Sequence, residues 1–309
     1  MAVALIDDAM VSAHLDAKVA NAAIEHALRE YNTGTLLAPA RLQSPLGEGS
    51  LVFTSGSFSQ GYGFRAYGTF PTQSDDQLTV VWDRDGNLEG IVVGPELGRR
   101  RTGALGAAAA VRLTSAGQKL VVGVLGAGAQ AFAQLWAISA VRSIEEIRSY
   151  RRDPVANVGF AERVQTELGL AAHPVKSPEA ACKDVDLLII ATGASKPVID
   201  DAWIRETCTI FTLGPKRRDA SELPEVLYQR AKLITSDSIA QLAVEGSDSI
   251  VDPARVVPLS DLQPHSGWTA YEPEKETPMS GIQLYLSTGL AGTELFVVQA
   301  LLARITKNE

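Results

Sequence analysis

KLVVGVLGAGAQA, residues 119–131, predicts a buried strand that passes through a glycine turn into a helix. Residues 120–125 form an unbroken aliphatic run, which is too short for a helix and is typical of a parallel strand covered on both faces. Gly126 then turns the chain. Gly128 has no Cβ, so the backbone that follows it can come within hydrogen-bonding distance of a ligand.

The start of the predicted helix completes the pattern GxGxx(G/A). The amides of Ala129 and Gln130 suit a pyrophosphate, whose charge also matches the positive end of the helix dipole. Ala131 stands at the third position, where helix and strand pack closest and a small residue is needed. A second strand is expected at residues 147–150, after an amphipathic helix, which gives the βαβ context of a dinucleotide-binding turn. An empty structural turn is the alternative.

Length and composition are those of a globular chain with room for two domains. Of the 309 residues, 46% are hydrophobic and 21% are charged, which is enough to bury a full core. Lysine and arginine number 28 against 36 acidic residues, so the formal net charge is -8. No extended basic face is present, which argues against a nucleic-acid partner.

Nothing in the sequence predicts export, a membrane span or a metal site. Asp7 and Asp8 precede any apolar run, so we expect no signal peptide, and no apolar segment reaches the ~18 residues of a membrane helix. We therefore expect a cytoplasmic protein, with Cys182 and Cys208 as reduced, buried thiols. The histidines show no metal-ligand spacing. They are His14, His26, His173 and His265.

The N-terminal part of the chain predicts a helix followed by an antiparallel meander. Residues 14–30 place apolar side chains at helical spacing, which indicates a surface helix with one buried stripe. Short β-branched or aromatic runs then predict four strands. These runs are residues 51–58, 64–70, 78–83 and 88–93. Residues 85–87, Asp-Gly-Asn, are typical of a hairpin turn, and residues 100–113 are alanine-rich and predict a helix.

Beyond the glycine turn, the predicted helices and strands alternate, which indicates a doubly wound parallel sheet of the α/β class. Helices are expected at 158–168 and 223–231, and strands at 187–191, 207–212 and 232–235. The polar segment 252–279 is expected to cover the surface. Residues 289–305 predict a final amphipathic helix.

With these pieces placed, the chain resembles the ornithine cyclodeaminase and mu-crystallin family over nearly its whole length. Seven segments are similar to family segments and follow in order. They are residues 38–41 (APAR), 63–71 (GFRAYGTFP), 101–104 (RTGA), 125–131 (LGAGAQA), 191–193 (ATG), 221–223 (SEL) and 287–291 (STGLA). The combination is far more specific than the glycine motif alone.

The resemblance implies a Rossmann domain inserted into a second α/β domain that binds substrate and dimerises. The expected boundaries are residues 1–114 plus 284–309 for the substrate-binding and dimerisation domain, and 115–283 for the dinucleotide-binding domain. It also implies hydride transfer between a nicotinamide cofactor and the carbon that bears nitrogen in a small amino or imino acid. A homodimer is expected through the first domain, because its meander exposes sheet edges and apolar faces.

The resemblance also assigns roles to single residues. Arg41 matches the arginine that holds the substrate carboxylate, a role suited to a planar guanidinium. Arg101 matches the arginine at the start of the helix that connects the domains, near substrate and cofactor, and Thr102 follows it there. Thr192 comes after an apolar strand, at the edge where such sheets bind ligands. Without the family, a solvated arginine is the alternative for Arg41 and Arg101, and a plain strand end for Thr192.

Two departures from the family pattern concern the chemistry. Arg65 stands where most of the family has lysine, and Lys216 stands where cyclodeaminases and alanine dehydrogenases have an aspartate that handles the proton at the substrate nitrogen. Arg65 and Lys216 are therefore our candidate catalytic residues, and Arg65 joins Arg41 and Arg101 as a candidate substrate ligand. In the alternative alignment, Asp219 supplies the carboxylate and Lys216 points to solvent.

The end of the second Rossmann strand predicts NADP(H) as the preferred cofactor, with NAD(H) as the alternative. Enzymes that select NAD place Asp or Glu at this strand tip to bind the ribose hydroxyl. Here the tip carries Arg151 and Arg152, which suit a 2'-phosphate. Asp153 follows a little too late along the chain and is expected only to balance the charge of the two arginines. Two solvated arginines are the alternative.

Three functions follow from these observations. The leading one is an NADP-dependent imine reductase or amino acid dehydrogenase that acts on a small amino, imino or keto acid. Ornithine cyclodeaminase proper, an ammonia lyase, is the enzyme alternative. The third is a non-catalytic NADPH-binding protein with a pocket for a small acid.

Overall fold

The structure is a computed structural model that describes residues 3–71, 76–264 and 280–308. It divides into two compact units. The first unit comprises Met1–Ala104 and Gly289–Glu309, and the second comprises Leu105–Thr288. These divisions fall near the expected boundaries, although the roles of the two domains stay predictions. His265 and most of the expected surface segment 252–279 lie outside the described residues.

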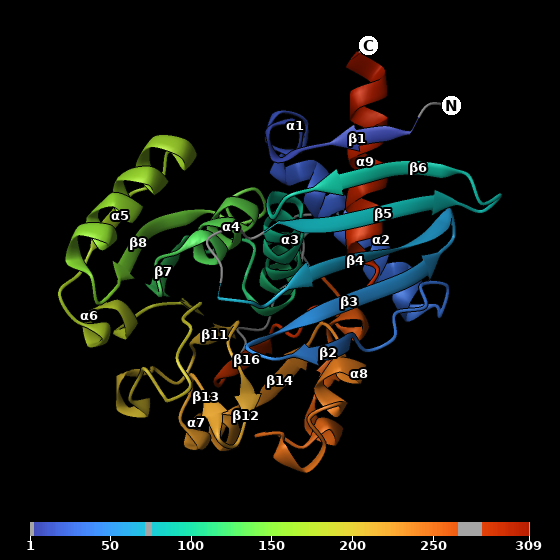
Figure 1. Cartoon of the computed structure of the whole chain (residues 1–309). Coiled ribbons are helices and arrows are strands. Elements are labelled where there is room, and N and C mark those ends of the chain that lie inside the picture. Colours follow the sequence, from blue (N-terminus) through green and yellow to red (C-terminus); the bar gives the residue numbers. More distant parts are fainter. Residues whose placement is uncertain (1–2, 72–75, 265–279, 309) are drawn as a thin grey trace. The chain divides into compact units, whose positions relative to one another are not determined.

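The first unit contains a six-stranded sheet in the order β1-β6-β5-β4-β3-β2 (Figure 1). Strand β1 runs parallel to β6, and the remaining neighbours are antiparallel. The predicted meander is thus confirmed, and β1 and β2 extend it on either side. The strands are β1 (Ala4–Ile6), β2 (Leu42–Leu46), β3 (Gly49–Phe58), β4 (Gly61–Gly68), β5 (Gln77–Asp83) and β6 (Leu88–Val93).

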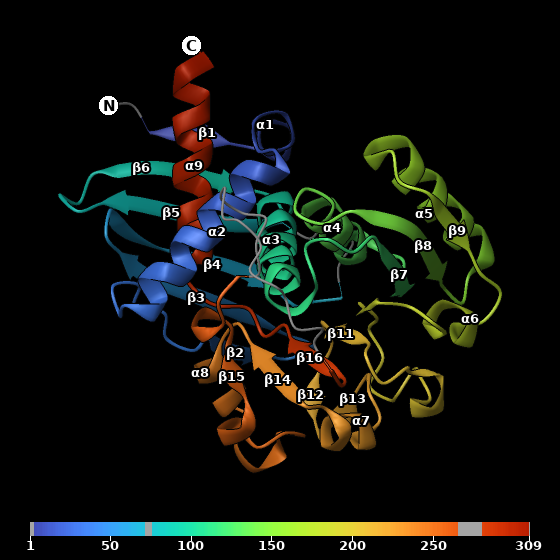
Figure 2. The ribbon, with the colours of Figure 1, turned by 180° about the vertical axis from the view of Figure 1, so that it is seen from behind.

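The helices of the first unit pack against one face of this sheet. They are α1 (Asp8–His14), α2 (Ala17–Asn32) and α9 (Thr293–Asn308), together with the start of α3 (Glu96–Leu113), which continues into the second unit. Helix α9 contacts α2 and strands β4, β5 and β6; Figure 2 shows α2 and α9 from behind. The helix expected at 14–30 instead begins at Ala17, because the Asp16 side chain caps its first turn by accepting from the Val19 amide.

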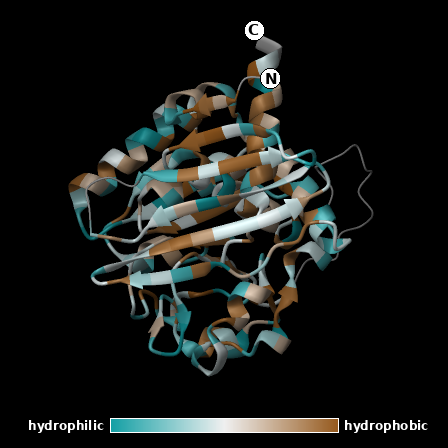
Figure 3. Ribbon diagram, turned by 45° about the vertical axis from the view of Figure 1, so that its right-hand side comes forward, coloured by the Kyte–Doolittle hydropathy of each residue, from teal (hydrophilic) through white to brown (hydrophobic). Residues whose placement is uncertain are grey.

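The two faces of the six-stranded sheet differ in chemistry. The strand register places Thr54, Arg65 and Thr79 on one face, and a Cβ at Gly63 on that face would lie 2.7 Å from Leu295 of α9. The opposite face carries exposed apolar side chains. Figure 3 shows hydrophobic and hydrophilic residues along the strands of this sheet. Side chains there include Leu5 (69% exposed), Leu42 (71%), Tyr62 (43%), Leu78 (37%) and Val93 (41%). We call these five residues the outer face.

The second unit contains an eight-stranded sheet in the order β15-β14-β16-β11-β10-β7-β8-β9, in which all neighbouring strands are parallel. The expected doubly wound parallel sheet is confirmed. The strands are β7 (Leu120–Leu125), β8 (Ile144–Tyr150), β9 (Ala172–Pro174), β10 (Leu187–Ile190), β11 (Thr209–Thr212), β14 (Leu233–Ser236), β15 (Val257–Pro258) and β16 (Gln283–Leu286).

The helices and turns of the second unit follow these strands along the chain. The helices are α4 (Ala129–Ile138), α5 (Pro154–Leu168), α6 (Pro178–Cys182), α7 (Glu225–Arg230) and α8 (Ile239–Ala243). Short 3₁₀ turns occur at Asp201–Trp203, Gly246–Asp248, Pro253–Arg255 and Leu259–Asp261. A small antiparallel hairpin is formed by β12 (Lys216–Arg217) and β13 (Ala220–Ser221).

The centre of the eight-stranded sheet is buried. Strand β10 is buried throughout, and so are β11 beside it and β16 on the far side of β11. Cys182 and Cys208 are free, buried thiols, as expected, and burial raises the pKa of each to about 12. Neither thiol therefore forms a reactive thiolate at neutral pH.

Within the described residues, no helix combines the length and the hydropathy needed to cross a bilayer. Likewise, among these residues no three histidine, cysteine or acidic side chains are grouped so that they could hold a metal ion.

Candidate functional site

A groove of about 1010 Å³ lies at the carboxyl edge of the eight-stranded sheet. It is lined by Pro178 and by the segments that follow three strands, residues 125–128 after β7, 150–153 after β8 and 191–198 after β10. Strands β7 and β10 are neighbours in the sheet, although β8 and β9 lie between them in the chain. The groove therefore opens where the strand order reverses, the point at which parallel sheets bind ligands.

The glycine turn shapes one wall of this groove. Gly126 has a φ of 84°, and a Cβ there would lie 2.3 Å from the Ala191 carbonyl oxygen, so only glycine fits. Gly128 is the N-cap of α4, where no side chain caps the helix. A Cβ at Gly128 would meet only the Gly126 carbonyl, at 4.0 Å, so the space in front of α4 is open.

The start of α4 fits a dinucleotide. The amides of a helix's first turn, here those of Ala129 and Gln130, have no acceptor within the helix. The side-chain oxygen Oε1 of Gln130 is buried and has no hydrogen-bond partner among the described residues. Ala131 is fully buried, as expected for the third motif position. An open glycine turn with donors aimed outward matches a pyrophosphate.

The tip of β8 brings positive charge to the groove. Nη1 of Arg151 donates to the Ala127 carbonyl over 3.2 Å, which folds this side chain back over the glycine turn. Arg152 lines the groove and is exposed. Asp153 is occupied as the N-cap of α5, since its Oδ1 accepts from two amides of that helix. Lys196, from the segment after β10, also lines the groove and was not predicted.

Thr192 lies at the predicted edge and is held by a buried carboxylate. Glu222 is fully buried, and its Oε1 accepts from the amide and the hydroxyl of Thr192, over 2.7 and 2.5 Å. Its Oε2 accepts from the Thr212 hydroxyl over 3.0 Å and from the Gly214 amide over 2.7 Å. The carboxylate thus satisfies donors from the ends of β10 and β11.

Lys216 lies in the hairpin that follows β11, and its side chain is turned inward. Only 7% of the residue is exposed, and Nζ donates to the carbonyls of Gly214 and Ser287, over 2.5 and 2.7 Å. Asp219 is at the surface, with 69% of its side chain exposed and a 2.9 Å bond from Arg217. That bond lowers the pKa of the Asp219 carboxyl. The alternative in which Lys216 points to solvent is therefore wrong for this structure.

In the first unit, Tyr67 joins two of the predicted arginines. The Tyr67 hydroxyl accepts from Nη1 of Arg41 over 3.3 Å, and the Tyr67 ring lies 4.7 Å from the Arg65 guanidinium carbon. Nε of Arg65 donates to Oε1 of Gln77 over 3.0 Å. Arg65 is nearly buried, at 9% exposed. Its guanidinium is therefore held by the Tyr67 ring and by the Gln77 amide, and burial restricts it further.

Gly289 brings the third arginine to the same place. A Cβ at this residue would lie 3.5 Å from Nη1 of Arg101 and 3.7 Å from Nη2 of Arg41. The two guanidinium groups therefore flank one point. Gly289 has a φ of 85°, which permits this close approach of the backbone. The structure thus brings Arg41, Arg65 and Arg101 into one cluster within the first unit.

A buried carboxylate lies among these arginines. Glu294, in the first turn of α9, is fully buried; its Oε2 lies 3.7 Å from Nε of Arg101, and its Oε1 accepts from the Thr54 hydroxyl. Burial alone would raise the pKa of this carboxyl, but Arg101 and Arg65, together with the Thr54 bond, lower it below the ordinary 4.5. Glu294 is therefore a carboxylate that keeps its charge in the protein interior.

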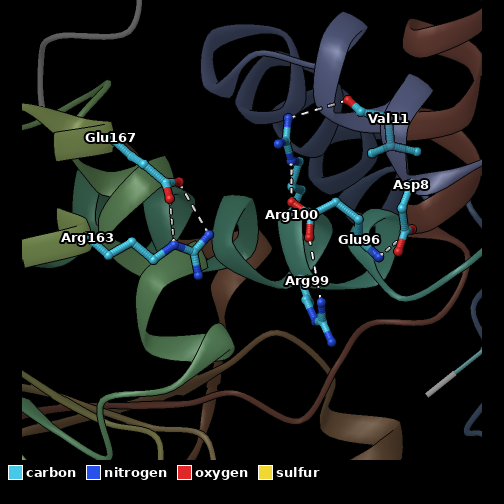
Figure 4. A network of polar contacts seen from close by, with 7 residues as sticks. All are labelled: Asp8, Val11, Glu96, Arg99, Arg100, Arg163 and Glu167. Atoms are coloured by element: carbon cyan, nitrogen blue, oxygen red, sulfur yellow. Dashed lines mark hydrogen bonds and ion pairs between the residues drawn. The ribbon is translucent and has the colours of Figure 1, made fainter. Parts of the chain in front are cut away.

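Arg101 differs from its neighbours in sequence, Arg99 and Arg100. In Figure 4, Arg100 reaches Glu96 and the Val11 carbonyl, and Arg99 lies near Glu96. Both serve the start of α3, whereas Arg101 is 4% exposed and belongs to the cluster. This settles which of the three arginines faces the buried carboxylate.

Thr102 makes a local contact. Its hydroxyl donates to the Gly98 carbonyl within α3 over 2.9 Å. Thr102 is not among the residues that line the groove.

Sequence reasoning missed Tyr67, Lys196, Glu222 and Glu294. Two of them stand inside segments that resemble the family: Tyr67 in residues 63–71 and Glu222 in residues 221–223. Glu294 follows residues 287–291 and is the only charged residue before Arg304 in helix α9, which is a usable signal. Nothing in the sequence separates Lys196 from other surface lysines.

Comparison with known proteins places the whole chain in one group. The model of the ornithine cyclodeaminase/mu-crystallin family matches residues 2–306. A Δ(1)-pyrroline-2-carboxylate reductase of Bacillus cereus is 27% identical over 204 residues, which are 65% of this chain and 62% of that protein. The first curated relatives are matched over only 42% to 62% of their lengths.

Solved structures share the fold over their full length. The Thermococcus litoralis Δ(1)-pyrroline-2-carboxylate reductase, in complex with NADH and L-proline, has a TM-score of 0.86 at 24% identity and covers 99% of this chain and 98% of that one. An archaeal alanine dehydrogenase dimer with bound NAD has a TM-score of 0.85 at 22% identity, with 100% and 98% covered. At these identities the likeness demonstrates the fold.

The charge state of Glu294 makes a prediction for stability. Because its folded pKa lies below 4.5, the carboxylate contributes stability that is fully present above pH 4.5 and is lost as the pH falls through the lower, folded value. Glu294→Gln should lower the free energy of unfolding at pH 7 by about 3 kcal/mol, and should flatten its dependence on pH below 4.5.

Urea unfolding between pH 3 and pH 7 measures both effects. Glu167→Gln is the matched control, because the Glu167 side chain is 50% exposed in its pair with Arg163 and should change little. Equal acid profiles for Glu294→Gln and the unmodified protein would contradict the assignment of a charged, buried Glu294.

Proposed function

The chain belongs to the ornithine cyclodeaminase/mu-crystallin family, and from that premise we propose that it is an NADP-dependent oxidoreductase that reduces a small anionic imine. The observation that supports this most is the groove at the carboxyl edge of the second unit, with its open position at Gly128. A bound nicotinamide cofactor supplies the hydride. The residues of this chain supply binding, orientation and charge.

The preference for NADPH rests on the tip of β8. Arg151, Arg152 and Lys196 bring three cationic side chains to the groove wall. The single carboxylate of that wall, Asp153, is occupied by the first amides of α5, so it is not placed to bind both hydroxyls of a ribose. Guanidinium groups bind phosphate oxygens through two parallel hydrogen bonds. This combination favours a 2'-phosphate over a 2'-hydroxyl.

The substrate is proposed to be an anion because three arginines lie together in the first unit. Arg101 and Arg65 lower the pKa of the Glu294 carboxyl, and Arg41 and Arg101 flank one point at Gly289. A substrate carboxylate is complementary to guanidinium groups placed in this way, and Arg41 suits it by geometry. The imine of a 2-oxo acid, including one with a second carboxylate, has the matching charge.

Cyclodeamination of ornithine fits these residues less well. That reaction requires a base to take a proton from the substrate amine, and a carboxylate is suited to it. Lys216 replaces the family aspartate, and its Nζ donates to two carbonyls, an arrangement that favours a protonated amine over a base. Reduction of an imine instead consumes a proton, which a lysine or water can deliver.

The first prediction of the proposal concerns turnover. With NADPH, the protein should reduce Δ1-pyrroline-2-carboxylate, or imines formed from oxaloacetate, pyruvate or 2-oxoglutarate with ammonia. It should form no proline from ornithine and NAD. Gly128→Ala should abolish turnover by filling the space before α4, whereas Gly159→Ala, where a Cβ meets nothing, should leave it unchanged.

Three results of that experiment discriminate among the functions. If the unmodified protein forms proline from ornithine at an enzyme-like rate, the argument from Lys216 is contradicted. If Lys216→Asp alone creates that activity, the argument is supported. Tight binding of NADPH without turnover of any imine would favour a cofactor-binding protein without catalysis.

The second prediction concerns the cofactor. NADPH should bind ~10-fold or more tightly than NADH at moderate salt, because charge-assisted hydrogen bonds contribute about 1.5–3 kcal/mol. Arg152→Gln should remove most of that preference and leave NADH affinity nearly unchanged. Arg163→Gln is the control, since Arg163 pairs with Glu167 on α5 (Figure 4). Equal dissociation constants for the two cofactors in the unmodified protein would refute the preference.

We also propose a homodimer through the outer face of the six-stranded sheet. Five large apolar side chains are exposed there, and apolar residues gathered on one exposed sheet face are typical of a protein interface. A twofold dimer, the commonest dimer symmetry, would pair this face with the same face of a second chain. The archaeal alanine dehydrogenase neighbour is also a dimer.

The third prediction tests this interface. Light scattering at micromolar concentration should give twice the chain mass of 32.9 kDa, and Leu78→Glu should give monomers by placing a charge in the buried face. Val155→Glu is the control, because Val155 is 80% exposed on α5 and should leave the dimer intact. A monomer mass for the unmodified chain would rule the dimer out.

A further inference from the structure

The groove and the hairpin that carries Lys216 are joined by backbone hydrogen bonds. The Ser221 amide donates to the Ser195 carbonyl over 3.2 Å, and the Val198 amide donates to the Glu222 carbonyl over 3.0 Å. Ser195 and Val198 line the groove. In the hairpin, Ser221 is also paired with Lys216 across β12 and β13. The groove segment 191–198 is thus tied to the hairpin strand that pairs with Lys216.

The Glu222 side chain reinforces this connection, and each of its oxygens serves a different segment. Within the part of the chain that the structure describes, Oε1 accepts from Thr192, through its amide and its hydroxyl. Oε2 accepts from Thr212 and Gly214, which end β11 and lead into the hairpin. A displacement of Thr192 therefore changes the acceptor geometry available to Gly214.

Gly214 links the Glu222 carboxylate to the Lys216 side chain. Its amide donates to Glu222, while its carbonyl accepts from Nζ of Lys216 over 2.5 Å. A Cβ at Gly214 would lie 2.3 Å from Cδ of Glu222, so the peptide and the carboxylate are in close contact. A chain of short polar contacts thus runs from Thr192 through Glu222 and Gly214 to Lys216.

We propose that Glu222 is a positioning residue that couples occupancy of the groove to the placement of Lys216. This rests on the proposed function only in that a nicotinamide cofactor occupies the groove. The Thr192 hydroxyl donates its proton to Glu222 and accepts from the Ala194 amide over 3.2 Å. Toward a ligand it therefore acts as a hydrogen-bond acceptor, which suits a donor such as a ribose hydroxyl.

Cofactor titration and hydrogen exchange test the proposal together. NADPH and NADH dissociation constants are measured by fluorescence titration, and amide exchange of residues 213–223 is measured with and without saturating NADPH. In the unmodified protein, NADPH should slow exchange in 213–223 as well as in 191–198. Glu222→Gln and Thr192→Val should each weaken NADPH binding ~10-fold and remove the slowing in 213–223, while Thr192→Ser should restore both.

Asp186→Asn is the matched control. Asp186 is a buried carboxylate of the same unit that accepts from the Val121 amide and from Gln118 at the opposite, amino edge of the sheet. Its loss should lower the melting temperature but leave the NADPH-dependent slowing in 213–223 in place. If Glu222→Gln does not fold, Thr192→Val carries the test, because it keeps the amide bond to Glu222 and removes only the hydroxyl.

Two results would overturn the proposal. If NADPH slows exchange in 213–223 equally in the unmodified protein and in every one of these variants that folds, the contact between the Thr192 hydroxyl and Glu222 does not couple the two segments, and the proposed function stands. If the unmodified protein binds neither NADPH nor NADH, both this inference and the proposed function fail.

Discussion

The close approach of Gly126 to the Ala191 carbonyl is the constraint from which the second unit takes its form. Because a Cβ at Gly126 would lie 2.3 Å from that oxygen, β7 and β10 can end side by side only with glycine at this turn. Their adjacency reverses the strand order and opens the groove between the segments that follow them. The same glycine turn places the N-terminus of α4 at that groove. The turn therefore determines both the strand arrangement and the position of the ligand site.

Glu222 in the second unit and Glu294 in the first are fully buried, and the two differ in how their charge is stabilised. Glu222 accepts four hydrogen bonds from neutral donors, two on each oxygen. Glu294 instead lies among arginines, which lower its pKa against the cost of burial. Removal of either carboxylate would leave buried hydrogen-bond donors or arginines without their partner. The resulting loss in the free energy of unfolding exceeds the net stabilisation that the intact interaction provides. These residues therefore fix the geometry of their surroundings more than they increase stability.

The sequence predicted the parallel sheet and the meander because both rest on local signals, namely apolar runs, alternation and glycine turns. It missed β16 (Gln283–Leu286), which begins with a glutamine a few residues after the polar segment 252–279, although the sheet is incomplete without it. Of the site, it predicted residues that resemble family motifs. It missed Tyr67, Glu222 and Glu294, since their roles depend on long-range contacts, such as the bond from Thr54 to Glu294 across 240 positions of the chain.

The departures from the family pattern act in one chemical direction. Arg65 stands where the resemblance places a lysine, and a guanidinium stays protonated in proteins. Lys216 stands where the resemblance places an aspartate, and its Nζ donates to two carbonyls. Both changes remove groups that can accept a proton and add groups that hold one. Oxidative deamination begins with loss of a proton from an amine, whereas reduction of an imine ends with its gain. This is the chemical basis on which we propose reduction, and the three arginines that lie together in the first unit are the basis on which we propose an acid as the molecule to be reduced.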